Sequence, residues 1–313
     1  MQYRRLGSTG LTVSTIGLGT WQYGGEWGRD FTQDEVDAIF DACRETGVNL
    51  VDTAECYGDH LSETFVGRAI ARDRDRWVVS TKFGDRFIRP FEREQRRRPE
   101  DVVEQLEASL RALRTDRVEL WLYHTWGNDS FFDEDVIAAV LRCRDRGKVR
   151  HVGNSVGPNT NVEQVDASPR MGIEAIQVVY NRLDRAAEDA VLPRCRAFGL
   201  GVMARLPLAS GYLSGKYDAD ATFSENEVRG RFHDDERRRR QLREAQTVKR
   251  HEVPEGVPMA RWALAWCLRH EAVACAVAGC KSAVQARDNA AAAELDPGEH
   301  DGHPLATAAP MAV

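Results

Sequence analysis

The feature that most constrains the fold is the regular alternation of short apolar runs with amphipathic stretches along most of the chain. The apolar runs are rich in β-branched residues, as expected for strands that are covered on both faces. Eight of them lie at 14–20, 48–53, 77–82, 118–124, 149–155, 175–181, 200–205 and 273–279. We therefore predict eight buried strands joined by helical connections.

The stretches between the strands follow a helical period. In 34–47, Val36, Ile39 and Cys43 fall on one face, and Gly47 is suited to end the helix. The same pattern recurs at 98–116 and 133–147. Eight strand–helix units within roughly 280 residues match an α/β fold of the (β/α)8 TIM-barrel type in count and size.

The main alternative fold is a doubly wound sheet, which carries a glycine-rich phosphate fingerprint after its first strand. Residues 17–22 read GLGTWQ, which lacks the third glycine of GxGxxG, and no helical pattern begins there. We therefore predict a single (β/α)8 barrel over 1–292.

Three segments depart from the alternation. Residues 3–17 contain two short runs around Ser8, Thr9 and Gly10, which predicts an N-terminal β-hairpin ahead of the barrel. Residues 206–258 form a long polar insertion before the last strand. Residues 293–313 are rich in Ala, Pro and Gly, so we expect a flexible C-terminal tail.

Composition excludes several classes of partner. The 313-residue chain has a net charge of -6, which argues against nucleic-acid binding. Its basic clusters at 93–101 and 236–240 are flanked by acids, so we interpret them as solvated helix faces or mobile loops. The N-terminus has no apolar signal core, and no apolar run approaches the ~20 residues that span a bilayer. The seven cysteines show no CxxC spacing, which favours reduced thiols and a cytoplasmic protein.

Chemically notable side chains stand at consecutive strand ends. Asp52 and Tyr57 follow the second predicted strand, Lys82 ends the third, and His124 ends the fourth. A single lysine or tyrosine at such a position is more often an exposed charge or a packing residue. In a barrel, however, the residues after the strand ends face the catalytic mouth, so the combination indicates a site.

These four residue types suit proton transfer to a carbonyl oxygen. A free tyrosine titrates near 10, and a neighbouring lysine ammonium favours its phenolate form. An aspartate beside the lysine holds that charge in place. A histidine can donate a hydrogen bond to the carbonyl oxygen and stabilise the charge that develops there. Such a site protonates the oxygen while another group delivers hydride to the carbon.

The same residues carry a resemblance to the aldo-keto reductase family, over roughly residues 3–292. The stretches that support it are YRRLGSTGLTVSTIGLGTW, VDTAECYGDHLSETFVGRAI, STKFG, VELWLYHTW, GKVRHVGNS, QVVYN, PLASGYLSGKY and AGCKSAVQARDN. The resemblance implies a (β/α)8 barrel that binds NADPH across its C-terminal face and reduces aldehydes and ketones. It places the catalytic tetrad at Asp52, Tyr57, Lys82 and His124, with Tyr57 as general acid.

The resemblance also implies a set of NADP(H) contacts. Ser155 and Gln177 match the positions that bind the nicotinamide carboxamide. The matches to the pyrophosphate loop are Leu208, Gly211, Lys216 and, from the insertion, Arg229. The matches around the 2′-phosphate and adenosine are Lys281, Ser282, Gln285, Asp288 and Asn289. Further cofactor contacts are expected at Gly19, Thr20, Trp21, Asp52, Arg205, Pro207 and Gly279.

Two positions depart from the family pattern. Val156 follows Ser155 where relatives usually have asparagine, and its side chain cannot replace an amide contact. Arg205 stands where relatives often have an aromatic residue stacked on the nicotinamide. A guanidinium plane can also stack, so we expect Arg205 in contact with that ring. Its charge, beside a ring that becomes positive during reduction, is suited to tune either the redox balance or the substrate preference.

We expect a wide substrate pocket and no metal. Its residues are expected to be Trp21, Tyr23, Trp27, Phe87, His124 and Trp126. The leading hypothesis is an NADPH-dependent reductase of a small aldehyde or ketone, such as a sugar or secondary-metabolite carbonyl, with no nucleic-acid or membrane partner. Two alternatives stay open: a cofactor-binding regulatory subunit resembling potassium-channel β subunits, and a sugar or alcohol dehydrogenase that works in the oxidative direction.

Overall fold

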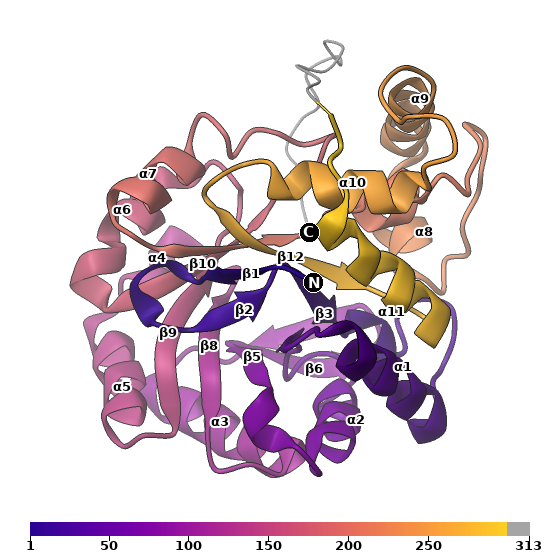
Figure 1. Ribbon diagram of the computed structural model, residues 1–313. Helices are drawn as coiled ribbons and strands as arrows, with labels where there is room; N and C mark the ends of the chain where they lie inside the picture. The colour runs from indigo at the N-terminus through magenta and orange to yellow at the C-terminus, as the bar shows by residue number, and fades with distance from the viewer. Residues whose placement is uncertain (299–313) are drawn as a thin grey trace.

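The computed structural model describes residues 1–298, which form a closed barrel of eight parallel strands (Figure 1). Each barrel strand pairs with the next barrel strand along the chain, and the last pairs with the first. The strands are β3 (Ile16–Gly19), β4 (Leu50–Asp52), β5 (Val78–Phe83), β8 (Val118–His124), β9 (Val149–Ser155), β10 (Ile173–Val179), β11 (Gly201–Arg205) and β12 (Val273–Gly279). The predicted (β/α)8 barrel is confirmed.

A helix follows each barrel strand within the described residues. These helices are α1 (Gln33–Thr46), α2 (Leu61–Ile70), α3 (Pro99–Leu113), α5 (Glu134–Asp145), α6 (Val162–Met171), α7 (Val191–Ala197), α10 (Met259–Leu268) and α11 (Ala283–Ala290). Helix α1 begins at a capping box between Thr32 and Glu35 and ends at Gly47, whose φ of 84° is the left-handed conformation that glycine adopts readily. Gly47 therefore ends the helix as predicted.

The predicted N-terminal hairpin is also confirmed. Strands β1 (Tyr3–Arg5) and β2 (Thr12–Ser14) pair antiparallel and lie beside β12 in Figure 1. Leu6 and Val13 are fully buried against apolar residues inside the barrel, such as Met203. The hairpin thus closes the end of the barrel opposite the carboxyl ends of its strands.

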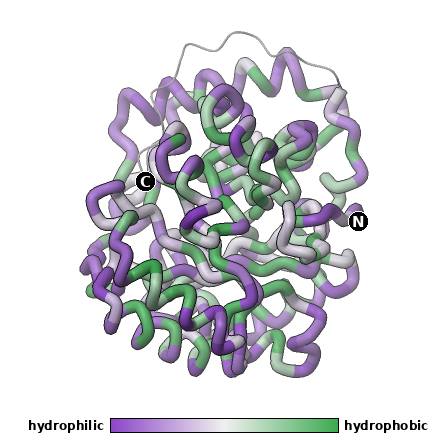
Figure 2. Tube along the Cα trace, turned by 90° about the vertical axis from the view of Figure 1, so that its left-hand side faces the viewer, coloured by the Kyte–Doolittle hydropathy of each residue, from purple (hydrophilic) through white to green (hydrophobic). Residues whose placement is uncertain are grey.

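The main core lies between the barrel and its helices. Val36, Ile39 and Phe40 of α1 are fully buried there, and the Phe40 ring lies 5.0 Å from that of Trp77. Figure 2 shows the same arrangement, with hydrophobic segments gathered inside and hydrophilic segments along the outside. The helical faces and the strands bury apolar surface together, which is the dominant favourable term in folding.

Two insertions extend the carboxyl end of the barrel. Strands β6 (Asp85–Arg89) and β7 (Glu92–Gln95) form an antiparallel hairpin after β5. The polar insertion at 206–258 contains η4 (Ala209–Ser214), α8 (Val228–Phe232) and α9 (Asp235–His251). The interpretation of both basic clusters as helix faces or loops is wrong in part, because residues 93–95 belong to β7. Residues 236–240 do lie in a helix.

The remaining short elements are η1 (Gly7–Thr9), η2 (Trp21–Gly24), η3 (Arg74–Arg76), α4 (Asn128–Phe131) and η5 (Ala291–Glu294). The predicted C-terminal tail lies mostly outside the described residues. Its described beginning is anchored where Trp262 Nε1 donates to the carbonyl of Pro297 at 3.1 Å. Within residues 1–298, the seven cysteines are free and buried, and no helix is long and apolar enough to cross a membrane.

Candidate active site

The four predicted catalytic residues converge at the carboxyl ends of adjacent strands. Asp52 is the last residue of β4, Lys82 lies near the end of β5, and His124 is the last residue of β8. Tyr57 lies in the turn that joins β4 to α2. Because parallel barrel strands all end on the same side, residues distant in sequence meet there.

Lys82 is the centre of a buried network. Lys82 is only 2% exposed, and its ammonium donates to Asp52 Oδ2 at 2.7 Å, to the Thr53 carbonyl at 2.7 Å and to Tyr57 Oη at 3.2 Å. A lysine has three N–H donors, so each one has an acceptor. Tyr57 therefore receives a hydrogen bond from Lys82 and keeps its own hydroxyl proton, which it donates to no group within the described residues.

Burial governs the ionisation of both partners. It raises the pKa of Tyr57 to about 12, although the Lys82 ammonium acts to lower that pKa. The expectation that Lys82 brings the phenol below its ordinary pKa is thus not met, because desolvation outweighs the ammonium. For Lys82, burial alone would lower the pKa, but Asp52 and Tyr57 raise it above its ordinary value. At neutral pH the pair is a neutral phenol beside an ammonium.

His124 stands across from Tyr57 as a neutral imidazole. Their ring centroids are 5.9 Å apart and nearly perpendicular. Burial, followed by the charges of Lys82 and Arg205, holds the pKa of His124 well below its usual range. Cys56 Sγ lies 3.5 Å from His124 Nδ1, and burial raises the pKa of Cys56 to about 12, so it is a thiol. Where that thiol donates to Nδ1, the single proton of the neutral ring is on Nε2.

Asp52 links the tetrad to the predicted nicotinamide contacts. Its Oδ1 accepts from Gln177 Nε2 at 3.0 Å and from Ser80 Oγ at 2.9 Å. Ser155 Oγ in turn donates to Gln177 Oε1 at 3.2 Å. Sequence reasoning missed Ser80, because a serine inside a strand carries no signal of its own.

A cavity of about 530 Å³ opens over this network. Its wall contains every predicted cofactor residue except one: Gly19, Thr20, Trp21, Asp52, Ser155, Gln177, Arg205, Pro207, Leu208, Gly211, Lys216, Arg229, Gly279, Lys281, Gln285, Asp288 and Asn289. The exception is Ser282. Its hydroxyl accepts the Gln285 backbone N–H and caps helix α11.

The predicted substrate pocket is only partly brought together. Of the six predicted residues, Trp21, Trp27 and His124 line the cavity. Tyr23 is buried instead against Phe31, with ring centroids 4.9 Å apart. Trp126 is fully buried and donates to the carbonyl of Phe83 at 3.3 Å. Phe87 lies in β6, outside the wall. For these three aromatic residues, packing decides the position.

Sequence reasoning also missed a cluster at the cavity mouth. Glu26, only 1% exposed, accepts from Trp21 Nε1 at 3.1 Å, from Arg93 Nη2 at 2.6 Å and from the Phe91 backbone at 2.6 Å. Phe91 also contacts Phe232 of α8, with centroids 5.7 Å apart. The β6–β7 hairpin and the long insertion therefore meet over the cavity.

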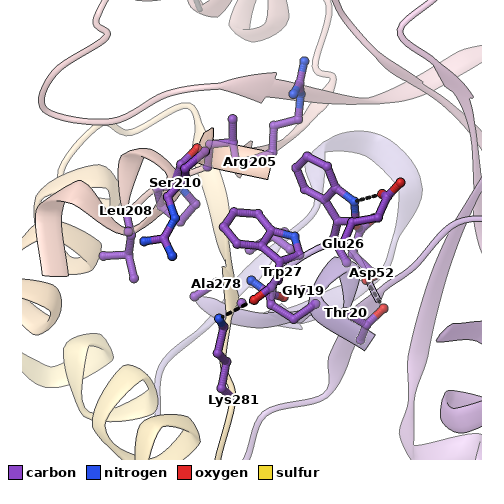
Figure 3. A pocket seen from close by; sticks show the side chains of 18 of the residues that line it. Gly19, Thr20, Glu26, Trp27, Asp52, Arg205, Leu208, Ser210, Ala278 and Lys281 are labelled. Carbon is purple, nitrogen blue, oxygen red and sulfur yellow. Dashed lines mark hydrogen bonds between the residues drawn. The ribbon is translucent and has the colours of Figure 1, made fainter. Parts of the chain in front are cut away.

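The part of the cavity beside the start of α11 is basic. Lys281 Nζ donates to the Trp27 carbonyl at 3.0 Å (Figure 3). Burial and then the charge of Arg229 lower the pKa of Lys281. Arg229 itself is paired with Glu227 at 2.8 Å. This arrangement concentrates positive charge where the resemblance expects a phosphate.

The loop after β11 is held in an uncommon backbone conformation. Leu206, Ala209 and Ser210 have φ values of 53°, 48° and 56°, and Gly211 has 92°. Non-glycine residues seldom adopt positive φ, and such strain clusters where a ligand is held. Three of these four residues, Leu206, Ser210 and Gly211, line the cavity.

Comparison with known proteins identifies the family. The Aldo/keto reductase family model matches residues 15–301. The aldo-keto reductase YhdN of Bacillus subtilis is 32% identical over 73% of this chain and 69% of its own length. The NADH-specific methylglyoxal reductase of Escherichia coli is 33% identical over 69% and 70%. A probable voltage-gated potassium channel subunit beta of Arabidopsis thaliana is 30% identical over 95% and 92%.

Solved structures agree with the sequence comparison. The holo form of the aldo-keto reductase AKR11C1 from Bacillus halodurans superimposes with a TM-score of 0.79 at 28% identity, covering 96% of this chain and 93% of that one. The glycerol dehydrogenase AKR11B4 of Gluconobacter oxydans also gives 0.79, at 26% identity over 93% and 89%. Fold and site thus define a barrel oxidoreductase that uses a nicotinamide cofactor. The chain belongs to the aldo/keto reductase family.

Proposed function

We propose that this protein reduces an aldehyde or ketone to an alcohol with NADPH, and that Tyr57 is the proton donor. One observation carries the proposal: the three donors of Lys82 are all engaged, so the Tyr57 hydroxyl proton is left to a ligand in the cavity. The neutral His124 beside it supplies a second hydrogen-bond donor for the same oxygen.

The cavity wall fits a nicotinamide cofactor. Ser155 and Gln177 offer hydroxyl and amide groups for the carboxamide, and the strained loop at 206–211 offers the backbone N–H groups of Leu208 and Ser210 for the pyrophosphate. Lys281 and the capped start of α11 suit a further phosphate. When bound, the reduced cofactor supplies hydride to the carbonyl carbon.

The residues of this chain complete the reaction at the oxygen. As the carbon gains hydride, the carbon–oxygen π bond breaks, and its electron pair takes the proton of Tyr57 Oη. The resulting phenolate is stabilised by Lys82, whose charge Asp52 holds in place. His124 donates a hydrogen bond to the same oxygen and stabilises its developing charge. Tyr57 recovers its proton from solvent after the alcohol leaves.

The preference for NADPH over NADH is part of the proposal. Lys281, with Arg229 and Lys216 close enough to act on its pKa, supports binding of the additional phosphate. A relative is named as an NADH-specific reductase, so the cofactor is a property to be measured for this chain.

The test is NADPH consumption at 340 nm by the parent enzyme with a panel of aldehydes and ketones. Saturable consumption with several carbonyls supports the proposal. Tight cofactor binding without turnover of any carbonyl would instead favour the regulatory role suggested by the similarity to a channel β subunit. Faster turnover of alcohols with NADP⁺ would favour the oxidative direction named for the glycerol dehydrogenase.

A further inference from the structure

Charged groups around the catalytic end of the cavity are mostly paired. The ion pairs there are Lys82–Asp52, Arg93–Glu26 and Arg97–Asp85, at 2.7, 2.6 and 3.1 Å. Each carboxylate thus has its own cation. A buried pair of this kind leaves no net charge to attract a ligand.

Arg205 is the exception. Within residues 1–298 it forms no ion pair, its Nη2 lies 3.5 Å from the Val156 carbonyl, and its enclosed Nε has no hydrogen-bond partner. A contact of 3.5 Å is long for an N–H donor, whose usual distance is about 2.9 Å. The Asp184 carboxylate acts on Arg205 electrostatically but accepts from Asn159 Nδ2 at 2.8 Å instead. Among the described residues, Arg205 is thus a partly buried cation without an ion-pair partner.

The position of Arg205 connects it to the reacting groups. It is the last residue of β11, on the same side of the barrel as Tyr57 and His124, and it lines the same cavity. Its charge contributes to lowering the pKa of His124, so the two are within electrostatic range. Figure 3 shows its guanidinium turned away from Lys281. An anion that binds Arg205 would therefore lie apart from the expected phosphate site, in the cavity that Tyr57 and His124 also line.

We propose that Arg205 binds an anionic group of the substrate, so that the preferred substrates are carbonyl compounds bearing a carboxylate or a phosphate. The inference rests on the proposed carbonyl reduction and names its substrate class. A guanidinium presents a planar fork of donors that matches either oxyanion with two parallel hydrogen bonds. An anionic group bound to Arg205 would also neutralise the positive charge of its guanidinium near the site of hydride transfer.

Matched pairs of substrates test the proposal. Butanal and 4-oxobutanoate differ by a terminal carboxylate, and glyceraldehyde and its 3-phosphate differ by a phosphate. We expect kcat/KM to favour the charged member of at least one pair by roughly tenfold to a hundredfold, as one charge-assisted interaction contributes. In Arg205→Gln this ratio should fall to about 1, and in Arg205→Lys, which keeps the charge but loses the fork, it should be intermediate.

The ratio within a pair cancels any loss that both substrates share. The matched control is Lys281→Ala, which removes a cation from the other end of the cavity and should keep the parental ratio at saturating cofactor. A preference within one pair alone identifies which oxyanion the site takes. Equal use of both members in both pairs, or a preference that Arg205→Gln does not change, would overturn the proposal.

A binding measurement separates this proposal from the proposed reaction. With NADP⁺ bound, butanoate should change the fluorescence of the cavity tryptophans Trp21 and Trp27 at lower concentration than the neutral butanamide does. Arg205→Gln should remove that difference. If no carbonyl is reduced but butanoate is still preferred, the proposed reduction fails and the anion site stands. Equal binding of butanoate and butanamide contradicts the anion site whether or not reduction occurs.

Discussion

Replacing Lys82 with methionine should be costly for both stability and activity. The substitution keeps an unbranched side chain as far as Cε but removes the ammonium that donates to Asp52, Thr53 and Tyr57. Asp52, only 5% exposed, is then a buried carboxylate without its cation. Breaking a buried pair in this way costs about 3–5 kcal/mol. Gln177 and Ser80 still donate to Asp52, so we expect the lower end of that range.

Activity should fall by at least about 10², the lower range for loss of general-acid assistance, because within the described residues no other group donates a hydrogen bond to the phenolate. Urea unfolding at pH 7 measures the stability, and NADPH consumption measures the rate. Lys148→Met is the matched control: it breaks a partly exposed pair with Glu107 and should cost under about 1 kcal/mol. The double variant Asp52→Asn/Lys82→Met should recover part of the lost stability but no activity. A Lys82→Met enzyme as stable and active as the parent would show that the Lys82–Asp52 pair supports neither the fold nor the reaction.

Two further predictions concern the cofactor and the pH dependence of stability. Lys281→Ala should raise the dissociation constant of NADPH by about one to two decades and leave that of NADH nearly unchanged. An equal rise in both dissociation constants would show that Lys281 is structural. Burial raises the pKa of Glu55 to about 8. Its neutral form therefore stabilises the fold below about pH 4.3, and this contribution is lost as pH rises toward 8. Glu55→Gln should thus gain roughly 1–3 kcal/mol over the parent at pH 8 and little at pH 5, measured by urea unfolding; a gain that is independent of pH would contradict this.

The barrel could be predicted because its buried strands appear in the sequence as apolar runs. The positions of the four predicted catalytic residues could be predicted because they lie at or just after the ends of those strands. Runs such as 118–124 are apolar throughout, which is typical of strands covered on both faces, and parallel strands end together. His124, at the end of such a run, therefore lies near Lys82. The ionisation of Tyr57 was not predictable, because the sequence names its charged neighbours but not the extent of its burial.

The β6–β7 hairpin could not be predicted for a related reason. Its strands, Asp85–Arg89 and Glu92–Gln95, are mostly charged and pair only with each other in the described structure, so no apolar alternation marks them. Aromatic residues in loops pose the opposite problem. Trp27 lines the cavity whereas Trp126 is buried against Phe83, and only neighbours distant in sequence decide between the two.

The role of Tyr57 as proton donor is tested most directly by Tyr57→Phe, assayed for carbonyl reduction and for NADPH affinity together. The matched control is Tyr23→Phe, which removes a buried hydroxyl that does not line the cavity. We predict that Tyr57→Phe lowers kcat by about 10²–10⁴ and keeps the dissociation constant of NADPH within a few-fold, while Tyr23→Phe stays active. Reduction by Tyr57→Phe within a few-fold of the parent rate would show that another group donates the proton.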